Sequence, residues 1–314
     1  MQRIYADDPL PPDLQGGVAA LGNFDGFHAG HQAVIGEARY RARAKGGPAL
    51  VITFDPHPVR LFKPDAPPMA LTTIEQRLDL FAEAGVDATI VLRFDREMAG
   101  LSPKTFVQQV LRERLHLKGV VTGEDFTFGA KAAGNVDDLR ALGAAAGIDA
   151  ATVAPVTGAD SERISSTRIR EALKAGEPRD AWRMLTRPFT IRAEVEHGAK
   201  LGRTLGTPTA NMRLGSYVRP RYGVYAVRGR LPDGTVLGGV ANLGIRPMIE
   251  PPVELLESWF FEFGGDLYGQ EIDVELIAWI REERKLDGMD ALKAQIAEDA
   301  EAAKAALDAA PARG

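Results

Sequence analysis

The chain has 314 residues, 45% hydrophobic and 26% charged, fractions typical of globular proteins, and its length favours two domains. It contains no cysteine, which excludes disulfides, thiolate metal sites and cysteine nucleophiles and favours a reducing compartment. A net charge of −5 argues against a nucleic-acid binder, and no apolar run is long enough to span a membrane. Because the first residues also lack an export signal, we expect a cytoplasmic protein that acts on small molecules without an obligate protein partner.

From Gly16 to about Leu185, apolar runs alternate with patterns typical of helices. Strands that are apolar throughout and separated by helices predict a parallel sheet covered on both faces. We therefore expect a doubly wound α/β domain over residues 1–186. The predicted strands are 18–22, 49–54, 88–92, 119–122 and 150–155, and the predicted helices are 31–43, 73–84, 103–115 and 136–146.

After residue 186 the apolar pattern changes to a period of two. Apolar residues alternate with polar ones in residues 189–196 and over most of residues 272–280, which marks strands with one buried face. The turn Pro232-Asp-Gly234 predicts a hairpin, and an amphipathic helix follows through Leu292, Ile296 and Leu307. We expect an antiparallel β-barrel domain with a terminal helix over residues 187–308, followed by a tail, 309–314.

The segment Gly22-Asn-Phe-Asp-Gly-Phe-His-Ala-Gly-His31 joins the first predicted strand to a helix. At such a turn the first helical N–H groups are unpaired and the helix dipole adds partial positive charge, so anions bind there. His28 and His31 share one side of the helix start and can donate hydrogen bonds to an α-phosphate. Their alternative role is capping or packing, and the polar turn residues can equally stabilise unusual backbone. The candidate phosphate-binding residues are Gly22, Asn23, Asp25 and Gly30.

The segment Ile164-Ser-Ser-Thr-Arg-Ile-Arg170 opens another predicted helix after the last strand of the same sheet. Its hydroxyls can cap that helix or bind phosphate, and its arginines can reach a triphosphate that loses pyrophosphate. A position at the carboxyl edge of the sheet favours the second role. The candidate residues are Ser165, Ser166, Thr167, Arg168 and Arg170.

Together these two segments resemble the HxGH nucleotidyltransferase superfamily, whose members transfer AMP in-line without a covalent enzyme intermediate. The segments Thr53-Phe-Asp-Pro-His-Pro58 and Gly123-Glu-Asp-Phe-Thr-Phe-Gly129 further resemble the amino-terminal module of bacterial bifunctional riboflavin kinase/FMN adenylyltransferase, or FAD synthetase. Aromatic and apolar walls suit a flavin ring, although core packing explains the aromatic residues equally well. The resemblance implies flavin and adenine pockets lined by His57, Pro58, Asp125 and Phe126.

The segment Gly202-Arg-Thr-Leu-Gly-Thr-Pro-Thr-Ala-Asn211 resembles the kinase signature of the same family. The resemblance implies that ATP phosphates pass close to Gly202 and Gly206, and that Thr209 and Asn211 hold Mg²⁺, which prefers hard oxygen ligands. A glycine-rich hairpin is the alternative interpretation.

Glu257 matches the family's catalytic glutamate by its spacing to Asp266-Leu-Tyr-Gly269. The resemblance implies that it accepts the proton of the ribityl 5′-hydroxyl as that oxygen attacks the γ-phosphate of ATP. A solvent-facing glutamate on a barrel strand is the alternative. Around the kinase pocket that the resemblance implies, the chain departs from the family pattern at Met248, Trp259 and Leu286.

The resemblance covers residues 16–307 and implies a six-stranded barrel for the second domain. It predicts ATP- and Mg²⁺-dependent phosphorylation of riboflavin to FMN, and then adenylylation of FMN to FAD with release of pyrophosphate. Two alternatives stay open from the sequence. One is an FMN adenylyltransferase with a degenerate kinase barrel, and the other is a flavin-binding carrier or regulator without catalysis.

Overall fold

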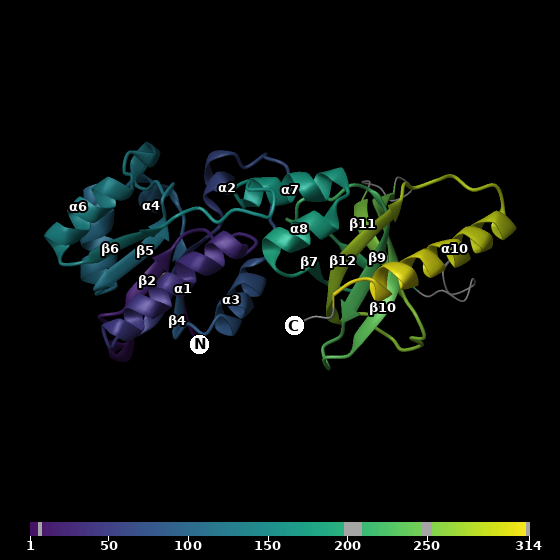
Figure 1. The fold of residues 1–314 in the computed structure, drawn as a ribbon, viewed down its shortest axis with the longest axis horizontal. Helices are drawn as coiled ribbons and strands as arrows, with labels where there is room; N and C mark the ends of the chain where they lie inside the picture. The colour runs from purple at the N-terminus through teal and green to yellow at the C-terminus, as the bar shows by residue number, and fades with distance from the viewer. Residues whose placement is uncertain (6–7, 198–208, 247–252, 312–314) are drawn as a thin grey trace. The chain divides into compact units, whose positions relative to one another are not determined.

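The computed structural model describes residues 1–5, 8–197, 209–246 and 253–311, and the chain divides into two compact units (Figure 1). The first unit comprises Met1–Pro67 and Ile74–Ser165. The second comprises Pro68–Thr73 and Ser166–Gly314, so that the helices between residues 166 and 185 group with the barrel. The domain boundary at residue 186 stays a prediction.

The first unit contains a six-stranded sheet in the order β1-β4-β3-β2-β5-β6, in which every neighbouring pair is parallel. This confirms the predicted parallel sheet. One strand, β1, was not expected from the sequence because it is a short edge strand in which only Ile4 is buried. The strands are β1 (Gln2–Tyr5), β2 (Val18–Leu21), β3 (Ala49–Asp55), β4 (Ala88–Arg93), β5 (Gly119–Gly123) and β6 (Asp149–Val153).

Both faces of this sheet are buried, as the continuous apolar strands require. Ala19 and Leu21 of β2 belong to one hydrophobic cluster, whereas Val18 and Ala20 belong to the cluster on the other face. The helices of this unit are α1 (Ala29–Ala44), α2 (Pro58–Phe62), α3 (Ile74–Glu83), α4 (Arg96–Gly100), α5 (Pro103–Thr105) and α6 (Val136–Ala146).

The helix predicted over residues 103–115 begins as expected but changes its winding. Ser102 accepts a hydrogen bond from the Thr105 N–H (3.1 Å) and Pro103 opens α5. The segment Phe106–Arg114 then forms a π-helix, whose wider turns bring Phe106, Val110 and Leu111 onto the core together.

Strand β2 lies between β3 and β5, so the chain leaves it toward one side of the sheet and later returns on the other. In such sheets ligands bind in the crevice at the carboxyl ends of the strands where the order reverses. The turn 22–28 follows β2 at this point, and the loops after β3, β5 and β6 leave the same edge. Four of the predicted motif segments therefore begin at the carboxyl edge of one sheet.

The second unit contains a six-stranded sheet in the order β7-β12-β9-β10-β11-β8, in which every neighbouring pair is antiparallel. An isolated bridge between Glu196 and Asn211 links the two ends of this order, which leaves the barrel nearly closed. The predicted barrel is confirmed. Its strands are β7 (Phe189–Glu194), β8 (Ala210–Arg213), β9 (Gly223–Arg230), β10 (Val236–Arg246), β11 (Val253–Phe260) and β12 (Glu271–Arg281).

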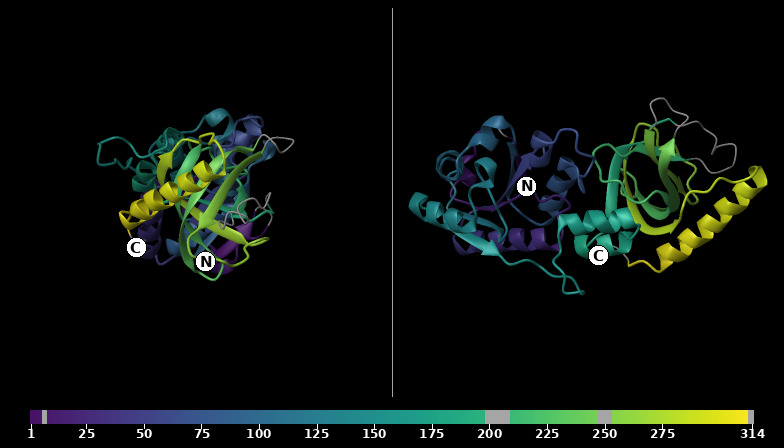
Figure 2. Two further views of the ribbon diagram at one scale, coloured as in Figure 1. Left: turned by 90° about the vertical axis from the view of Figure 1, so that its right-hand side faces the viewer. Right: turned by 90° about the horizontal axis from the view of Figure 1, so that it is seen from above.

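The predicted hairpin at Pro232-Asp-Gly234 joins β9 to β10, with Gly234 at φ +87° and the Leu231 N–H bonded to the Thr235 carbonyl (2.9 Å). The helices among the described residues of this unit are α7 (Ser166–Ala175), α8 (Pro178–Leu185) and α10 (Met289–Asp308). Figure 2 shows α10 beside the barrel, where Ala303 packs with Ala226 and Ile277.

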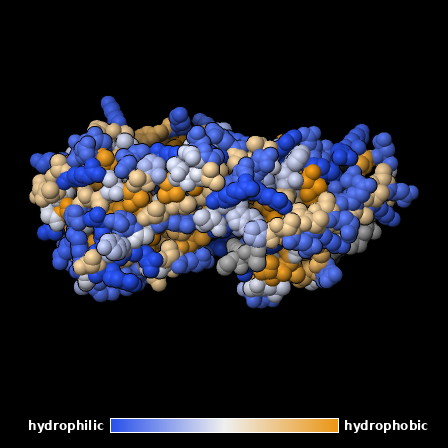
Figure 3. Space-filling view, viewed as in Figure 1, coloured by the Kyte–Doolittle hydropathy of each residue, from blue (hydrophilic) through white to orange (hydrophobic). Residues whose placement is uncertain are grey.

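The described residues include no helix long and apolar enough to cross a membrane. On the face drawn in Figure 3, hydrophilic side chains surround smaller hydrophobic patches, because much of the apolar content lies in the cores of the two units.

A buried ion pair anchors α10 to the barrel. Arg281 of β12 donates from Nε and Nη2 to the two carboxylate oxygens of Asp299 (2.7 and 2.6 Å), and the two side chains are 14% and 7% exposed. Gln295 donates to the same carboxylate (3.1 Å). Removing one partner of such a pair leaves the other charge buried without compensation.

We expect Asp299→Asn to lower the free energy of unfolding of the second unit by about 3 kcal/mol, because Arg281 then stays buried without its counter-charge. Urea unfolding monitored by tryptophan fluorescence measures this. Glu301→Gln is the matched control on the same helix, since Glu301 pairs with exposed Lys304, and it should leave the unfolding midpoint unchanged. Equal midpoints for the two variants would contradict the anchoring role.

Candidate active sites

The turn between β2 and α1 has an unusual backbone. Phe24 (φ +52°), Gly26 (φ +83°) and Phe27 (φ +43°) all lie in the left-handed region, which bulky residues rarely adopt. Both phenylalanines are buried, and each ring packs edge-on against Phe81. Core packing thus holds a conformation that costs free energy, as is common at functional sites.

The two histidines of this turn lie against each other at the start of α1. Their rings are stacked with centroids 3.6 Å apart, and the Phe24 ring lies nearly perpendicular to the His31 ring with centroids 5.3 Å apart. His28 is the N-cap residue, and its Nδ1 accepts a hydrogen bond from the His31 N–H (3.3 Å). His28 therefore does cap the helix, as one of the two roles considered for it requires, and it does so through Nδ1. The same cap fixes the ring at the positive end of the helix dipole.

Gly30 allows the His28 ring to approach the first turn of α1 closely. A Cβ atom at this position would lie 3.1 Å from His28 Cε1 and 3.9 Å from the carbonyl oxygen of Ile164. The beginning of the Ile164–Arg170 segment therefore lies beside the histidine pair within the first unit.

Asn23 brings polar atoms to the same turn. Its side-chain Oδ1 is buried and has no hydrogen-bond partner among the residues that the structure describes, so it suits a ligand donor. Asp25 is also buried. Gly22 joins the end of β2 to this turn, and its N–H bonds to the Ile52 carbonyl of β3 (3.1 Å).

The candidate flavin residues lie on the loops after β3 and β5. His57 caps α2 by accepting a hydrogen bond from the Val59 N–H (3.3 Å), and Pro58 begins that helix. Asp125 forms an ion pair with Arg163, in which both side chains are about half exposed. Phe126 stacks on the core residue Phe128 with centroids 5.8 Å apart. Core packing, the alternative role of this aromatic residue, is therefore observed.

The residues of the second phosphate candidate are divided between the two units. Ser165 ends the first unit, whereas Ser166, Thr167, Arg168 and Arg170 belong to α7 in the second. Arg170 Nε donates to the Met69 carbonyl (2.7 Å), so this side chain ties α7 to the segment Pro68–Thr73 of its own unit.

In the barrel, strand register places three polar side chains in one row. Asn211 of β8 pairs with Glu257 of β11, and Glu257 pairs with Asn242 of β10. Directly paired residues of neighbouring strands project from the same face of a sheet. Asn211 is 5% exposed, and its Nδ2 donates to the Thr209 carbonyl (3.3 Å). The predicted metal-binding residues and the predicted catalytic glutamate are thus neighbours.

Two charged residues that the sequence analysis missed surround Glu257. Arg246 forms ion pairs with Glu257 and with Glu283 (3.2 Å for the second), and Glu283 accepts a hydrogen bond from Asn242 Nδ2 (2.7 Å). A Cβ at Gly244 would lie 2.4 Å from Glu283 Oε1, so the glycine makes room for this network. Glu257 is therefore held in a defined place rather than facing open solvent.

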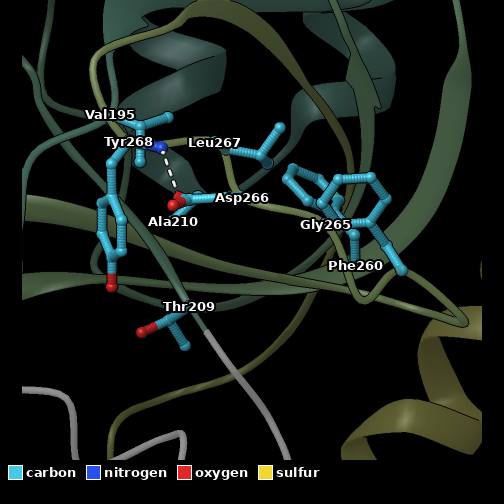
Figure 4. A pocket seen from close by; sticks show the side chains of 9 residues that line it. Val195, Thr209, Ala210, Phe260, Gly265, Asp266, Leu267 and Tyr268 are labelled. Carbon is cyan, nitrogen blue, oxygen red and sulfur yellow. Dashed lines mark hydrogen bonds between the residues drawn. The ribbon is translucent and has the colours of Figure 1, made fainter.

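The second unit also contains a small pocket, which is lined by Thr209 and Ala210 at the start of β8 (Figure 4). Thr209 lies on its wall together with Asp266 and Tyr268, and Asp266 accepts a hydrogen bond from the Tyr268 N–H (3.0 Å). Asp266, Leu267 and Tyr268 of the Asp266–Gly269 segment thus share the wall of this pocket with Thr209, one of the two predicted metal residues. The pocket is lined by Val195, Thr209, Ala210, Phe260, Phe263, Gly265, Asp266, Leu267 and Tyr268.

Three residues of the sequence analysis, Gly202, Gly206 and Met248, lie outside the described residues. Trp259 lies on β11 two residues after Glu257 and meets Phe261 edge-on at 5.3 Å.

Comparison with known proteins identifies both halves of the chain. A family model described as FAD synthetase matches residues 10–168, and one described as riboflavin kinase matches residues 185–307. A bifunctional riboflavin kinase/FMN adenylyltransferase of Haemophilus influenzae is 41% identical over 93% of this chain and 94% of its own. The chain belongs to this family.

A second relative carries the same description, and one solved structure shares the fold. The Escherichia coli K12 member is 39% identical over 91% of each chain. A crystal structure of a Streptococcus pneumoniae protein, described as a macrolide-efflux protein, superposes with a TM-score of 0.86 at 29% identity, over 97% of this chain and 99% of that one. Family membership confirms the predicted fold class, the enzyme class and the two activities, whereas the roles of individual residues stay predictions.

The His28 cap should affect the local stability of the first turn of α1. His28→Ala should cost about 1 kcal/mol of local stability because the His31 N–H loses its acceptor, whereas His28→Asn supplies a capping oxygen and should cost less. Hydrogen exchange of the first-turn amides of α1 measures the difference. Asp95→Ala, which removes the cap of α4, is the control and should leave those amides unchanged. Equal exchange in both His28 variants would contradict the capping role.

Proposed function

We propose that the residues located above perform the two ATP-dependent steps by which this chain converts riboflavin to FAD. The barrel phosphorylates riboflavin to FMN, and the doubly wound unit joins FMN to AMP and releases pyrophosphate. The observation that carries the proposal is the stacked histidine pair at the N-terminus of α1, which lies where the strand order of a parallel sheet reverses.

In the adenylyl transfer, a phosphate oxygen of FMN attacks the α-phosphorus of ATP, and the bond to the bridging oxygen of the β-phosphate breaks. FMN phosphate is already ionised, so the step needs no general base. His28 and His31 donate hydrogen bonds to the α-phosphate as negative charge builds there, together with the N–H groups of α1. Further phosphate contacts come from Gly22, Asn23, Asp25, Gly30, Ser165, Ser166, Thr167, Arg168 and Arg170.

In the kinase step, Glu257 accepts the proton of the ribityl 5′-hydroxyl as that oxygen attacks the γ-phosphorus of ATP and ADP leaves. Arg246 orients the Glu257 carboxylate, and Glu283 holds Arg246 from the other side. The glycines at 202 and 206 stay proposed contacts of the ATP phosphates.

The residues near Glu257 fit a bound Mg²⁺ ion. Thr209 and Asn211 offer a hydroxyl and an amide oxygen, the hard donors that this ion prefers, and nucleotide phosphates can complete its coordination. The described residues hold no group of three or more carboxylates or imidazoles suited to a metal, so phosphates would supply much of the negative charge. When bound, the ion neutralises charge on the transferred phosphoryl group.

The flavin of FMN is proposed to lie against the loops that carry His57, Pro58, Asp125 and Phe126. These loops follow β3 and β5, the two neighbours of β2, so they flank the histidine pair along the sheet edge. We further propose that the protein works in the cytoplasm on riboflavin, FMN and ATP, since a chain without cysteine suits a reducing compartment.

The two sites should be separable by mutation. We expect the double variant His28→Ala/His31→Ala to lower the rate of FAD formation from FMN by about 10³-fold or more, because two donors to the α-phosphate are lost. The same variant should phosphorylate riboflavin at the wild-type rate. Chromatography of the flavin products, with each substrate supplied separately, measures both rates.

Glu257→Gln should show the reverse pattern, with riboflavin phosphorylation lowered by about 10²-fold or more and FAD formation unchanged. His116→Asn is a control for the histidine replacements, since His116 is exposed and lies outside both sites.

The wild-type protein also distinguishes the two alternative functions. A wild-type protein that makes FAD from FMN but no FMN from riboflavin would indicate a degenerate barrel. A protein that binds flavin and forms neither product would be a carrier.

The metal proposal has its own measurement. Chelation by EDTA should stop the kinase reaction, and excess Mg²⁺ should restore it. Asn211→Ala should raise the Mg²⁺ concentration for half-maximal kinase rate by about 10-fold because one oxygen ligand is lost. FAD formation from FMN by the same variant is the internal control. An unchanged Mg²⁺ dependence of the kinase would contradict the role of Asn211.

A further inference from the structure

The first unit contains a buried cation that no motif accounts for. Arg77 of α3 is 4% exposed, and the carboxylates of Asp25, Asp55 and Glu75 act on it electrostatically. Burial lowers the pKa of Arg77, and the three carboxylates oppose that shift. An arginine stays protonated in such a place. A full positive charge therefore lies in the core beside the β2–α1 turn.

Arg77 contacts the backbone of the turn directly. Its Nη1 donates to the carbonyl oxygen of Asn23 (2.7 Å) and to Thr53 Oγ1 (3.2 Å). The fully buried Thr53 hydroxyl donates to the same carbonyl (3.0 Å). Two donors from α3 and β3 thus hold one oxygen of the turn.

This carbonyl lies at the start of the strained segment. The next residue, Phe24, is the first of the residues with positive φ, and His28 follows four positions later. Fixing the Asn23 peptide fixes the direction in which the chain enters the turn. It also sets where the Asn23 side chain and the histidine pair lie.

A cation is a costly means of filling this space. Burying a charge costs several kcal/mol, and an apolar side chain of similar volume often gives a more stable core. Two consequences of the charge are useful for binding phosphate. It gives the Asn23 carbonyl a charge-assisted hydrogen bond, and it offsets the buried carboxylate of Asp25 near an anion site.

We propose that Arg77 is a positioning residue for adenylyl transfer, which holds the β2–α1 turn by the Asn23 carbonyl and offsets the charge of Asp25. The inference rests on the proposed function of the first unit. Thr53 shares the positioning role, because its hydroxyl donates to the same oxygen.

The test compares Arg77→Met, Arg77→Lys and the matched control Arg3→Met in the full chain. Arg3 lies on β1, at the edge of the sheet and three places from β2 in the strand order. It forms an exposed ion pair with Asp79, which lies on α3 like Arg77. Arg77→Met should lower kcat for FAD formation from FMN by about 100-fold, because a small misplacement of the catalytic groups is that costly. KM for FMN should change by less than about 3-fold, since the loops after β3 and β5 are unaffected.

Arg77→Lys should recover about 10-fold of the lost kcat, because an ammonium group keeps the charge and one hydrogen bond. Arg3→Met should match wild type. The riboflavin kinase rate of every variant should stay unchanged and serves as an internal control. Calorimetric titration with FMN measures the fraction of binding-competent protein, which separates misplacement from partial unfolding.

Thr53→Val provides the answer if Arg77→Met does not fold. It removes one donor to the Asn23 carbonyl at nearly constant volume, and kcat should fall by about 10-fold at unchanged KM. Wild-type kcat in Arg77→Met or in Thr53→Val would overturn the inference, as would a lysine variant no better than methionine. Absence of FAD formation by the wild-type chain would instead refute the proposed function.

Discussion

The backbone of the β2–α1 turn is the constraint on which the adenylyltransferase unit depends. A helix that begins immediately after a parallel strand presents unpaired N–H groups, but only a sharply bent turn aims them at the sheet edge. Here that bend requires positive φ angles at two phenylalanines, which their burial against Phe81 maintains. The His28 cap then uses one imidazole nitrogen to begin the helix and leaves the ring at its positive end.

The proposed kinase site of the barrel is built in a different way. Its polar groups come from side chains in one row across three strands, with Asn211, Glu257 and Asn242 in register. No helix dipole is needed, because the network of Arg246 and Glu283 fixes the charged groups. In the proposed mechanism, the first unit uses backbone donors to stabilise developing charge, whereas the second uses a positioned carboxylate and oxygen donors suited to a metal.

Much of the fold can be predicted from the sequence because most strands are buried either on both faces or on one face only, and each arrangement leaves a distinct apolar pattern. Strand β2 is buried on both faces and so is apolar throughout, while β7 is buried on one face and so alternates. The edge strand β1 shows neither pattern, because Ile4 is its only buried residue, and it could not be predicted. The π-helical winding after Thr105 also leaves no mark that distinguishes it from an ordinary amphipathic helix.

Some site residues could likewise be predicted from the sequence and others could not. The histidine pair could be found because a local motif creates it, whereas Arg77 acts on a carbonyl 54 residues away and Glu283 on an amide 41 residues away. The one available signal for Arg77 was a charge beside Leu78 on the apolar face of a predicted helix. Glu257 was found by resemblance, and its row with Asn211 and Asn242 comes from strand register, which spacing along the chain does not determine.

The central claim is that one chain transfers two different parts of ATP to the flavin at two sites. The most direct measurement incubates the protein with riboflavin, Mg²⁺ and ATP that carries radioactive phosphorus at either the α or the γ position, followed by separation of the flavin products. The account predicts γ label in FMN and in FAD, and α label in FAD alone. Absence of α label from every flavin product, or of γ label from FMN, would contradict it.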